Sequence, residues 1–103
     1  MTAYAFFEVT LIDDATPEQR ERYGRYRQAV PALVERFGGR YIARAWQAEV
    51  LEGDAAGDRF HLIEFDEADS ARAMWTSAEY GALKEGRQGA VDVRALLISP
   101  ADA

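Results

Sequence analysis

His61 is the only histidine in the chain, and histidine is the side chain best suited to acid–base chemistry near neutral pH. An imidazole titrates near neutral pH, so it can remove a proton from a phenol or from an activated carbon. The alternative is a half-buried strand histidine whose nitrogens bond to a neighbour or to water. The sequence leaves both interpretations open. In the functional interpretation, His61 is a general base or a general acid.

Arg44 lies between two alanines in a segment whose composition is typical of a strand. A guanidinium that is buried there needs an anionic partner, because an unpaired buried charge is unfavourable. One candidate partner is a carboxylate of the protein, from Glu8, Glu49 or Glu64. The other is an anionic group of a ligand, in which case Arg44 would bind a carboxylate or stabilise an enolate.

Aromatic side chains form a third group of candidates, because ring faces stack on flat ligands while Tyr and Trp polar tips orient them. The predicted substrate-binding residues are Tyr26, Trp46, Trp75, Tyr80 and the carboxylate of Glu64. Tyr26 and Tyr80 fall on the apolar stripes of predicted helices, where packing in the core is the simpler explanation. Trp46 is therefore the better pocket candidate.

Composition and charge argue against several other classes of function. The 103 residues contain no cysteine, which excludes disulfides and thiolate metal sites. Glu64 and Asp66 share the chain with a single histidine, so we predict no metal site, and we predict no other cofactor. The net charge of −6 disfavours nucleic acid and anionic membrane surfaces as partners. Because no segment has the pattern of a membrane span or a signal peptide, we expect a cytoplasmic protein.

Hydrophobic patterning predicts the elements that position these residues. Aromatic and β-branched runs predict strands over residues 3–12, 40–47, 59–65 and 91–98. The second strand is followed by a break or a short extra strand over 49–53. Thr16 and Pro17 begin a first helix that ends at Gly38. Asp66 and Ser77 are candidate caps for a second helix and its continuation.

This order of elements, β-α-β-β-α-β, is that of the α+β ferredoxin-like split βαβ sandwich. In that fold two helices cover one face of a four-stranded antiparallel sheet. We expect a single domain over residues 1–99 and a flexible tail over 100–103.

Both faces of the predicted sheet are apolar, because Phe7 and Val9 alternate with Tyr4 and Phe6 in the first strand. A sheet face that is in contact with water should instead be polar. We therefore expect a homodimer in which the same face of a second copy covers the exposed side. Two such sheets would close into a dimeric α+β barrel.

Short motifs spread over nearly the whole chain carry a resemblance to a known family. They are Tyr23-x-x-Tyr26, Val30-Pro31-Ala32-Leu33, Phe37-Gly38-Gly39-Arg40, Arg44, Glu49-Val50-Leu51-Glu52-Gly53, Glu64-Phe65, Trp75-x-Ser77-x-Glu79-Tyr80-x-x-Leu83 and Arg87. In these motifs the sequence resembles the DUF1330 family of the dimeric α+β barrel superfamily. The resemblance implies the ferredoxin-like fold and the dimer, whereas it implies no reaction, because the family has no known function.

The sequence departs from the family pattern at two places. Arg44-Ala45-Trp46 stands where members often have Arg-Gly-Gly, and His61 stands where an aliphatic residue is usual. Either change could reshape a pocket.

Two functional hypotheses follow. The first is a small cofactor-independent enzyme, cyclase, isomerase or monooxygenase-like, that acts on a hydrophobic or aromatic small metabolite. It would use general acid/base chemistry in a pocket between sheet and helices, with His61 and Arg44 as catalytic residues. This hypothesis draws on an analogy with superfamily enzymes at the level of the fold. The alternative is a non-catalytic homodimer that binds a small molecule or has an accessory role.

Overall fold

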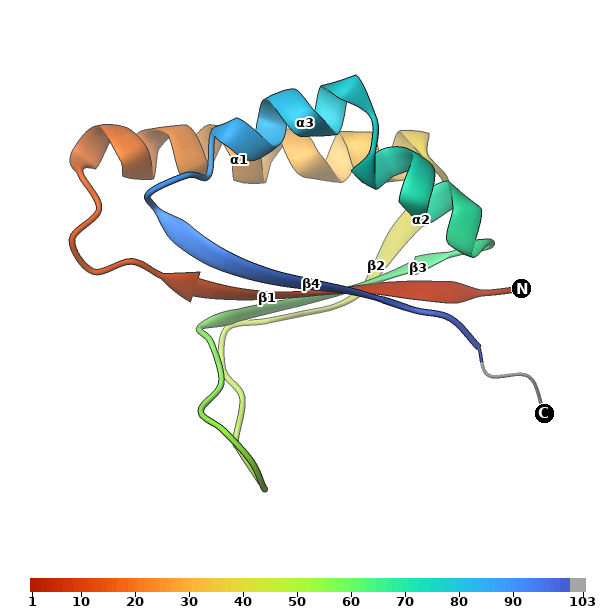
Figure 1. The fold of residues 1–103 in the computed structure, drawn as a ribbon, viewed down its shortest axis with the longest axis horizontal. Coiled ribbons are helices and arrows are strands. Elements are labelled where there is room, and N and C mark those ends of the chain that lie inside the picture. The colour runs from red at the N-terminus through yellow and green to blue at the C-terminus, as the bar shows by residue number, and fades with distance from the viewer. Residues whose placement is uncertain (101–103) are drawn as a thin grey trace.

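The computed structural model describes residues 1–100 and shows a four-stranded sheet with its helices on one side (Figure 1). In chain order the elements are β1 (Ala3–Leu11), α1 (Pro17–Arg36), β2 (Gly39–Ala45), β3 (Arg59–Phe65), α2 (Ala68–Trp75), α3 (Ala78–Glu85) and β4 (Val91–Ile98). All neighbouring strands are antiparallel, in the order β2-β3-β1-β4. The predicted ferredoxin-like α+β fold is confirmed. Of the tail predicted over 100–103, residues 101–103 lie outside the described residues.

The first helix begins and ends as its sequence predicts. The Gln19 amide donates to the Thr16 hydroxyl oxygen (3.1 Å), and the Thr16 amide donates to the Gln19 side-chain oxygen (2.8 Å). This reciprocal pair satisfies two of the amide groups that a helix leaves unpaired at its start. The helix continues past Pro31 to Arg36, and Gly38 follows it at φ +85°, a conformation that suits glycine.

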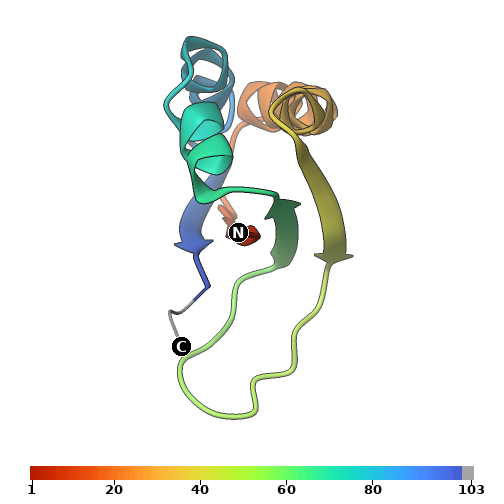
Figure 2. The same ribbon diagram turned by 90° about the vertical axis from the view of Figure 1, so that its right-hand side faces the viewer.

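Two local expectations need correction. Glu67, not Asp66, occupies the N-cap position of α2, and it makes no side-chain capping bond. Residues 46–58 form a loop without the short strand expected over 49–53, because β2 pairs only with β3 and ends at Ala45. This loop projects away from the helices, on the other side of the sheet (Figures 1 and 2). Ser77 caps α3 as predicted, accepting a hydrogen bond from the Tyr80 amide (3.1 Å).

Strand register separates a helix-facing side from an open side of the sheet. Ala3, Ala5, Phe7 and Val9 pair with Phe65, Ile63, His61 and Arg59 and lie on the helix-facing side. The larger core cluster lies at the Phe65 end of this side, where Phe65 and Ile63 are almost completely buried, and a smaller one surrounds Val9 at the other end. The apolar side chains of the open side, which we call the open-face cluster, are Tyr4, Phe6, Phe60, Leu62, Leu96 and Ile98. Phe6 and Leu62 are paired partners within it.

A β-bulge in β2 decides where Arg44 lies. Tyr41 pairs with Ile63, but Ala43 pairs with Leu62, so the register shifts between Tyr41 and Ala43. In a regular strand Tyr41 and Arg44 would lie on opposite faces. The extra residue in the bulge brings both to the helix-facing side, with Arg44 paired to His61.

Gly39 allows β2 to approach the core closely. A Cβ atom there would lie 2.7 Å from the ring of Phe65 and 2.8 Å from Cγ1 of Val34, which is closer than carbon atoms pack. The absence of a side chain at this position therefore lets β2, β3 and α1 meet.

We expect Gly39→Ala to lower the free energy of unfolding by about 1 to 3 kcal/mol, because the added methyl group overpacks this contact. Gly81→Ala is the matched control, since nothing lies near a Cβ added in that helix. The control should raise stability by roughly 0.5 to 1 kcal/mol through helix propensity. Urea unfolding measures both values, and equal effects of the two substitutions would contradict the close contact.

Candidate functional site

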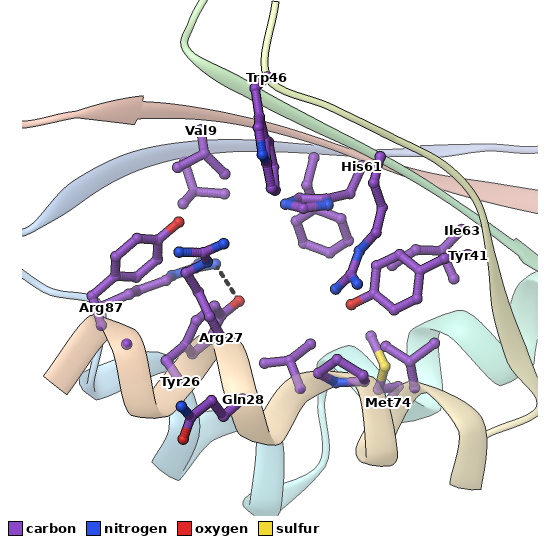
Figure 3. A pocket seen from close by; sticks show the side chains of 18 residues that line it. Val9, Tyr26, Arg27, Gln28, Tyr41, Trp46, His61, Ile63, Met74 and Arg87 are labelled. Atoms are coloured by element: carbon purple, nitrogen blue, oxygen red, sulfur yellow. Dashed lines mark hydrogen bonds between the residues drawn. The ribbon is translucent and has the colours of Figure 1, made fainter. Parts of the chain in front are cut away.

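A cavity of about 490 Å³ lies between α1 and the helix-facing side of the sheet (Figure 3). Four of the residues that sequence analysis predicted for a site line it: His61, Arg44, Tyr26 and Trp46. His61 comes from β3 and Arg44 from β2, where the bulge turns it inward. Trp46 follows β2 and is half exposed at the edge of the cavity, whereas Tyr26 comes from α1.

Three other predicted site residues do not line this cavity. Tyr80 is completely buried and reaches the site only through its hydroxyl, which lies 2.9 Å from the hydroxyl of Tyr26. Trp75 lines a neighbouring cavity of about 300 Å³ against β4. Glu64 lies on the open side of the sheet and pairs with Arg40. This position corrects the expectation that Glu64 contacts a ligand together with His61, because strand alternation puts the two on opposite faces.

The His61 ring lies among aromatic rings at the cavity wall. It makes edge-on contacts with Tyr41 (ring centroids 5.9 Å apart) and with Trp46 (5.7 Å). Its Nδ1 atom is buried and has no hydrogen-bond partner among the described residues. Burying a polar atom without a partner costs about 1 to 3 kcal/mol, so the structure keeps this nitrogen unpaired at a cost in stability.

His61 is uncharged at neutral pH. Burial, together with the positive charges of Arg44, Arg27 and Arg59, lowers its pKa from 6.5 to about 4. Between these two pH values the unfolded chain binds the proton and the folded protein does not. This histidine therefore makes the folded state progressively less stable as the pH falls from about 6.5 to about 4. At neutral pH it is a free base that can accept a proton.

Arg44 makes no salt bridge among residues 1–100. Its guanidinium lies over the ring of Tyr41, with Cζ 4.1 Å from the ring centroid. Two of its candidate partners, Glu8 and Glu64, lie on the open side, where they pair with other arginines. The third, Glu49, lies in the loop after β2. An internal ion pair therefore does not explain Arg44, whose side chain is exposed at the edge of the cavity and can bind water or a ligand anion.

Two further arginines contact Trp46, one from α1 and one from β3. Cζ of Arg27 lies 5.5 Å from the centroid of the Trp46 ring system, and Cζ of Arg59 lies 5.2 Å from it. Arg59 also donates a hydrogen bond to the hydroxyl of Tyr23 (3.2 Å). Neither arginine forms a salt bridge within the described chain, and none of the described residues that line the cavity is acidic. The cavity is thus positively charged in a protein of net charge −6.

Sequence reasoning missed Arg27, Tyr41 and Arg87 as cavity residues, and it missed Arg59, which contacts Trp46 beside the cavity. Arg59 had a usable signal, because it lies two positions before His61 and so shares its face. Tyr41 had none, since a bulge cannot be recognised from this pattern. Arg87 lies in a turn, where no periodicity indicates that a side chain is buried.

The described residues hold no cluster of three or more His, Asp or Glu side chains that could bind a metal ion. Nor does any helix within residues 1–100 have the length and apolar character needed to cross a membrane. The chemistry that this arrangement offers is proton transfer to a neutral imidazole and stabilisation of negative charge by arginines.

Comparison with known proteins gives a family model and several solved structures. The model described as "Domain of unknown function (DUF1330)" matches residues 2–101. No protein with curated annotation matches the sequence.

Among the similar structures is a protein of unknown function from Rhodopseudomonas palustris, with 23% identity and a TM-score of 0.77 over 99% of this chain and 84% of that one. A dimeric ferredoxin-like protein of unknown function from Bacteroides fragilis has 17% identity and a TM-score of 0.61 over 93% of each chain. SnoaB, a cofactor-independent oxygenase from Streptomyces nogalater, has 12% identity and a TM-score of 0.59 over 100% of this chain and 97% of that one. These likenesses support the fold.

We expect the single histidine to titrate with a pKa near 4 in an NMR experiment, and Arg44→Gln to raise that pKa by removing a nearby positive charge. Arg40→Gln is the matched control, since Arg40 is on the same strand but pairs with Glu64 on the open side. An equal change in the pKa from both substitutions would show that Arg44 does not face His61.

Proposed function

The chain belongs to the DUF1330 family of unknown function, and from its cavity we propose that it is a small cofactor-independent enzyme acting on a hydrophobic or aromatic metabolite. The observation that carries this proposal is a neutral His61 in a cavity whose charged side chains are all arginines. A base next to unpaired positive charges is suited to reactions in which a neutral substrate becomes an anion.

The proposed step is the removal of a proton from a carbon next to a carbonyl group. His61 takes the proton on an imidazole nitrogen, and the electron pair of the broken C–H bond moves onto the carbonyl oxygen as an enolate. Arg44 stabilises the negative oxygen, while Trp46 stacks on the flat part of the substrate. Cyclisation, isomerisation and oxygenation without a cofactor can all begin with such a deprotonation.

The similarity to SnoaB supports this proposal only at the level of the fold, because the two sequences are 12% identical. It shows that a chain of this shape can be an oxygenase that needs no cofactor. The alternative function is binding without catalysis. The unpaired Nδ1 of His61 fits both hypotheses, and the exchange experiment below distinguishes them.

We expect the protein to accelerate the exchange of deuterium from D₂O into 2-indanone, a flat aromatic ketone with acidic C–H bonds, as followed by NMR. His61→Ala should slow the catalysed exchange by about 10² to 10⁴-fold, the usual contribution of a general base. Arg25→Gln is the control, because Arg25 is exposed on α1 and pairs with Glu21 outside the cavity. Binding of 2-indanone without faster exchange would favour the non-catalytic function.

We also propose that residues 1–99 form one domain that assembles as a homodimer through the open-face cluster. Phe6 and Phe60 stack there with ring centroids 6.3 Å apart, and Ile98 remains 46% exposed. Contiguous apolar patches of this kind are unusual on the surface of a monomer. The loop after β2 extends on the same side and exposes Leu51 (Figure 1). The similar protein from Bacteroides fragilis is dimeric.

We expect Leu62→Glu to convert the dimer to monomers, since it places a charge at the centre of the open-face cluster. Light scattering after size exclusion measures the mass. Ala82→Glu on the exposed surface of α3 should leave the dimer unchanged. Dimers that persist with both Leu62→Glu and Phe6→Glu would refute an interface on this face.

A further inference from the structure

Arg87 is a buried guanidinium at the wall of the cavity, outside the group formed by His61 and Arg44. Its side chain is 8% exposed and lines the cavity. The turn after α3 fixes its backbone, because its amide bonds to the Lys84 carbonyl and its own carbonyl accepts from Ala90 and Val91. This side chain is therefore positioned before any ligand binds.

The hydrogen bonds of Arg87 leave most of its donors unused. One terminal nitrogen, Nη1, donates to the hydroxyls of Tyr26 (3.2 Å) and Tyr80 (3.1 Å), which are themselves 2.9 Å apart. A guanidinium has five N–H donors, and within residues 1–100 the others have no side-chain acceptor. The part of the chain that the structure describes also gives Arg87 no carboxylate partner.

The partners of Arg87 are neutral, so its charge is not compensated. Burial raises the pKa of Tyr26 well above its ordinary value, which keeps that hydroxyl protonated. The rings of Tyr26, Trp75 and Tyr80 lie 5.6 to 5.9 Å from Cζ of Arg87 and stabilise the cation without neutralising it. A buried cation in this state is complementary to an anion.

Arg87 and the catalytic group lie on different sides of the cavity. Figure 3 shows Arg87 and Tyr26 toward one end, joined by their hydrogen bond, with Tyr41 and His61 toward the other. The cavity lining also includes apolar side chains such as Val30. A flat ligand that extends along the cavity would meet an arginine at each end.

We propose that Arg87, with the hydroxyl of Tyr26, binds a carboxylate of the substrate at the end of the cavity away from His61. This inference deepens the proposed function and rests on it, because it names the substrate class as aromatic carboxylic acids that react at a group distant from the carboxylate. The planar fork of a guanidinium matches a carboxylate through two parallel hydrogen bonds. Arg44 is then left to interact with the charge that develops at the reacting end.

The test compares 2-indanone-5-carboxylate with neutral 2-indanone, measuring the dissociation constant of each by calorimetry. The carboxylate should bind more tightly, and Arg87→Gln should weaken its binding about tenfold or more while changing the binding of 2-indanone little. Arg87→Lys, which keeps the charge but not the fork, should also lose part of this preference. The unchanged NMR titration of His61 checks that each variant remains folded.

Three results would overturn the proposal. The carboxylate could bind no more tightly than the ketone, Arg87→Gln and Arg87→Lys could weaken both ligands equally, or Arg44→Gln could abolish the preference that both Arg87 variants retain. Calorimetry does not depend on turnover, so these results are separate from the deuterium-exchange assay. Carboxylate selectivity without exchange would support the Arg87 site and remove the catalytic role of His61.

Discussion

The contact between α1 and one end of the sheet is the constraint on which the site depends. At that end Gly39 lets β2 lie against Phe65 and Val34, and the space between helix and sheet is filled. Along β3 the side chains on the same face change from Phe65 and Ile63, which are buried, to His61 and Arg59, which are partly exposed. One strand therefore contributes to both the core and the cavity wall.

The charge of the protein is distributed unevenly between its surface and this cavity. The chain has six more acidic than basic side chains, yet the described cavity lining contains arginines and no carboxylate. Salt bridges on the surface use Arg25, Arg36 and Arg40, whereas Arg44 and Arg87 contact aromatic rings and hydroxyls. Aromatic partners stabilise a cation without cancelling its charge. The cavity thus retains a positive potential that acidic partners would have removed.

Sequence patterns predicted the elements well, because caps and alternation are local signals. The composition of residues 59–65 predicts the strand found there, and the Thr16 motif predicts the capping box. The alternation of side chains predicts the two apolar faces of the sheet. The site was predicted less completely. Arg44 was recognised as unusual between alanines, but its orientation depends on a bulge that brings it to the same face as Tyr41. Glu64 was chosen by residue type, although its position three residues after His61 in one strand puts it on the opposite face.

The low pKa of His61 and the positive cavity are parts of one electrostatic balance. The arginines that favour a developing enolate also disfavour the imidazolium that forms when His61 takes a proton. A histidine with a pKa near 4 is therefore a weak base while the cavity holds no anion. The enolate oxygen that forms beside Arg44 would offset part of this positive potential and raise the pKa of His61 while the proton is transferred. By this linkage, the negative charge that the reaction creates would also stabilise the protonated base that forms with it.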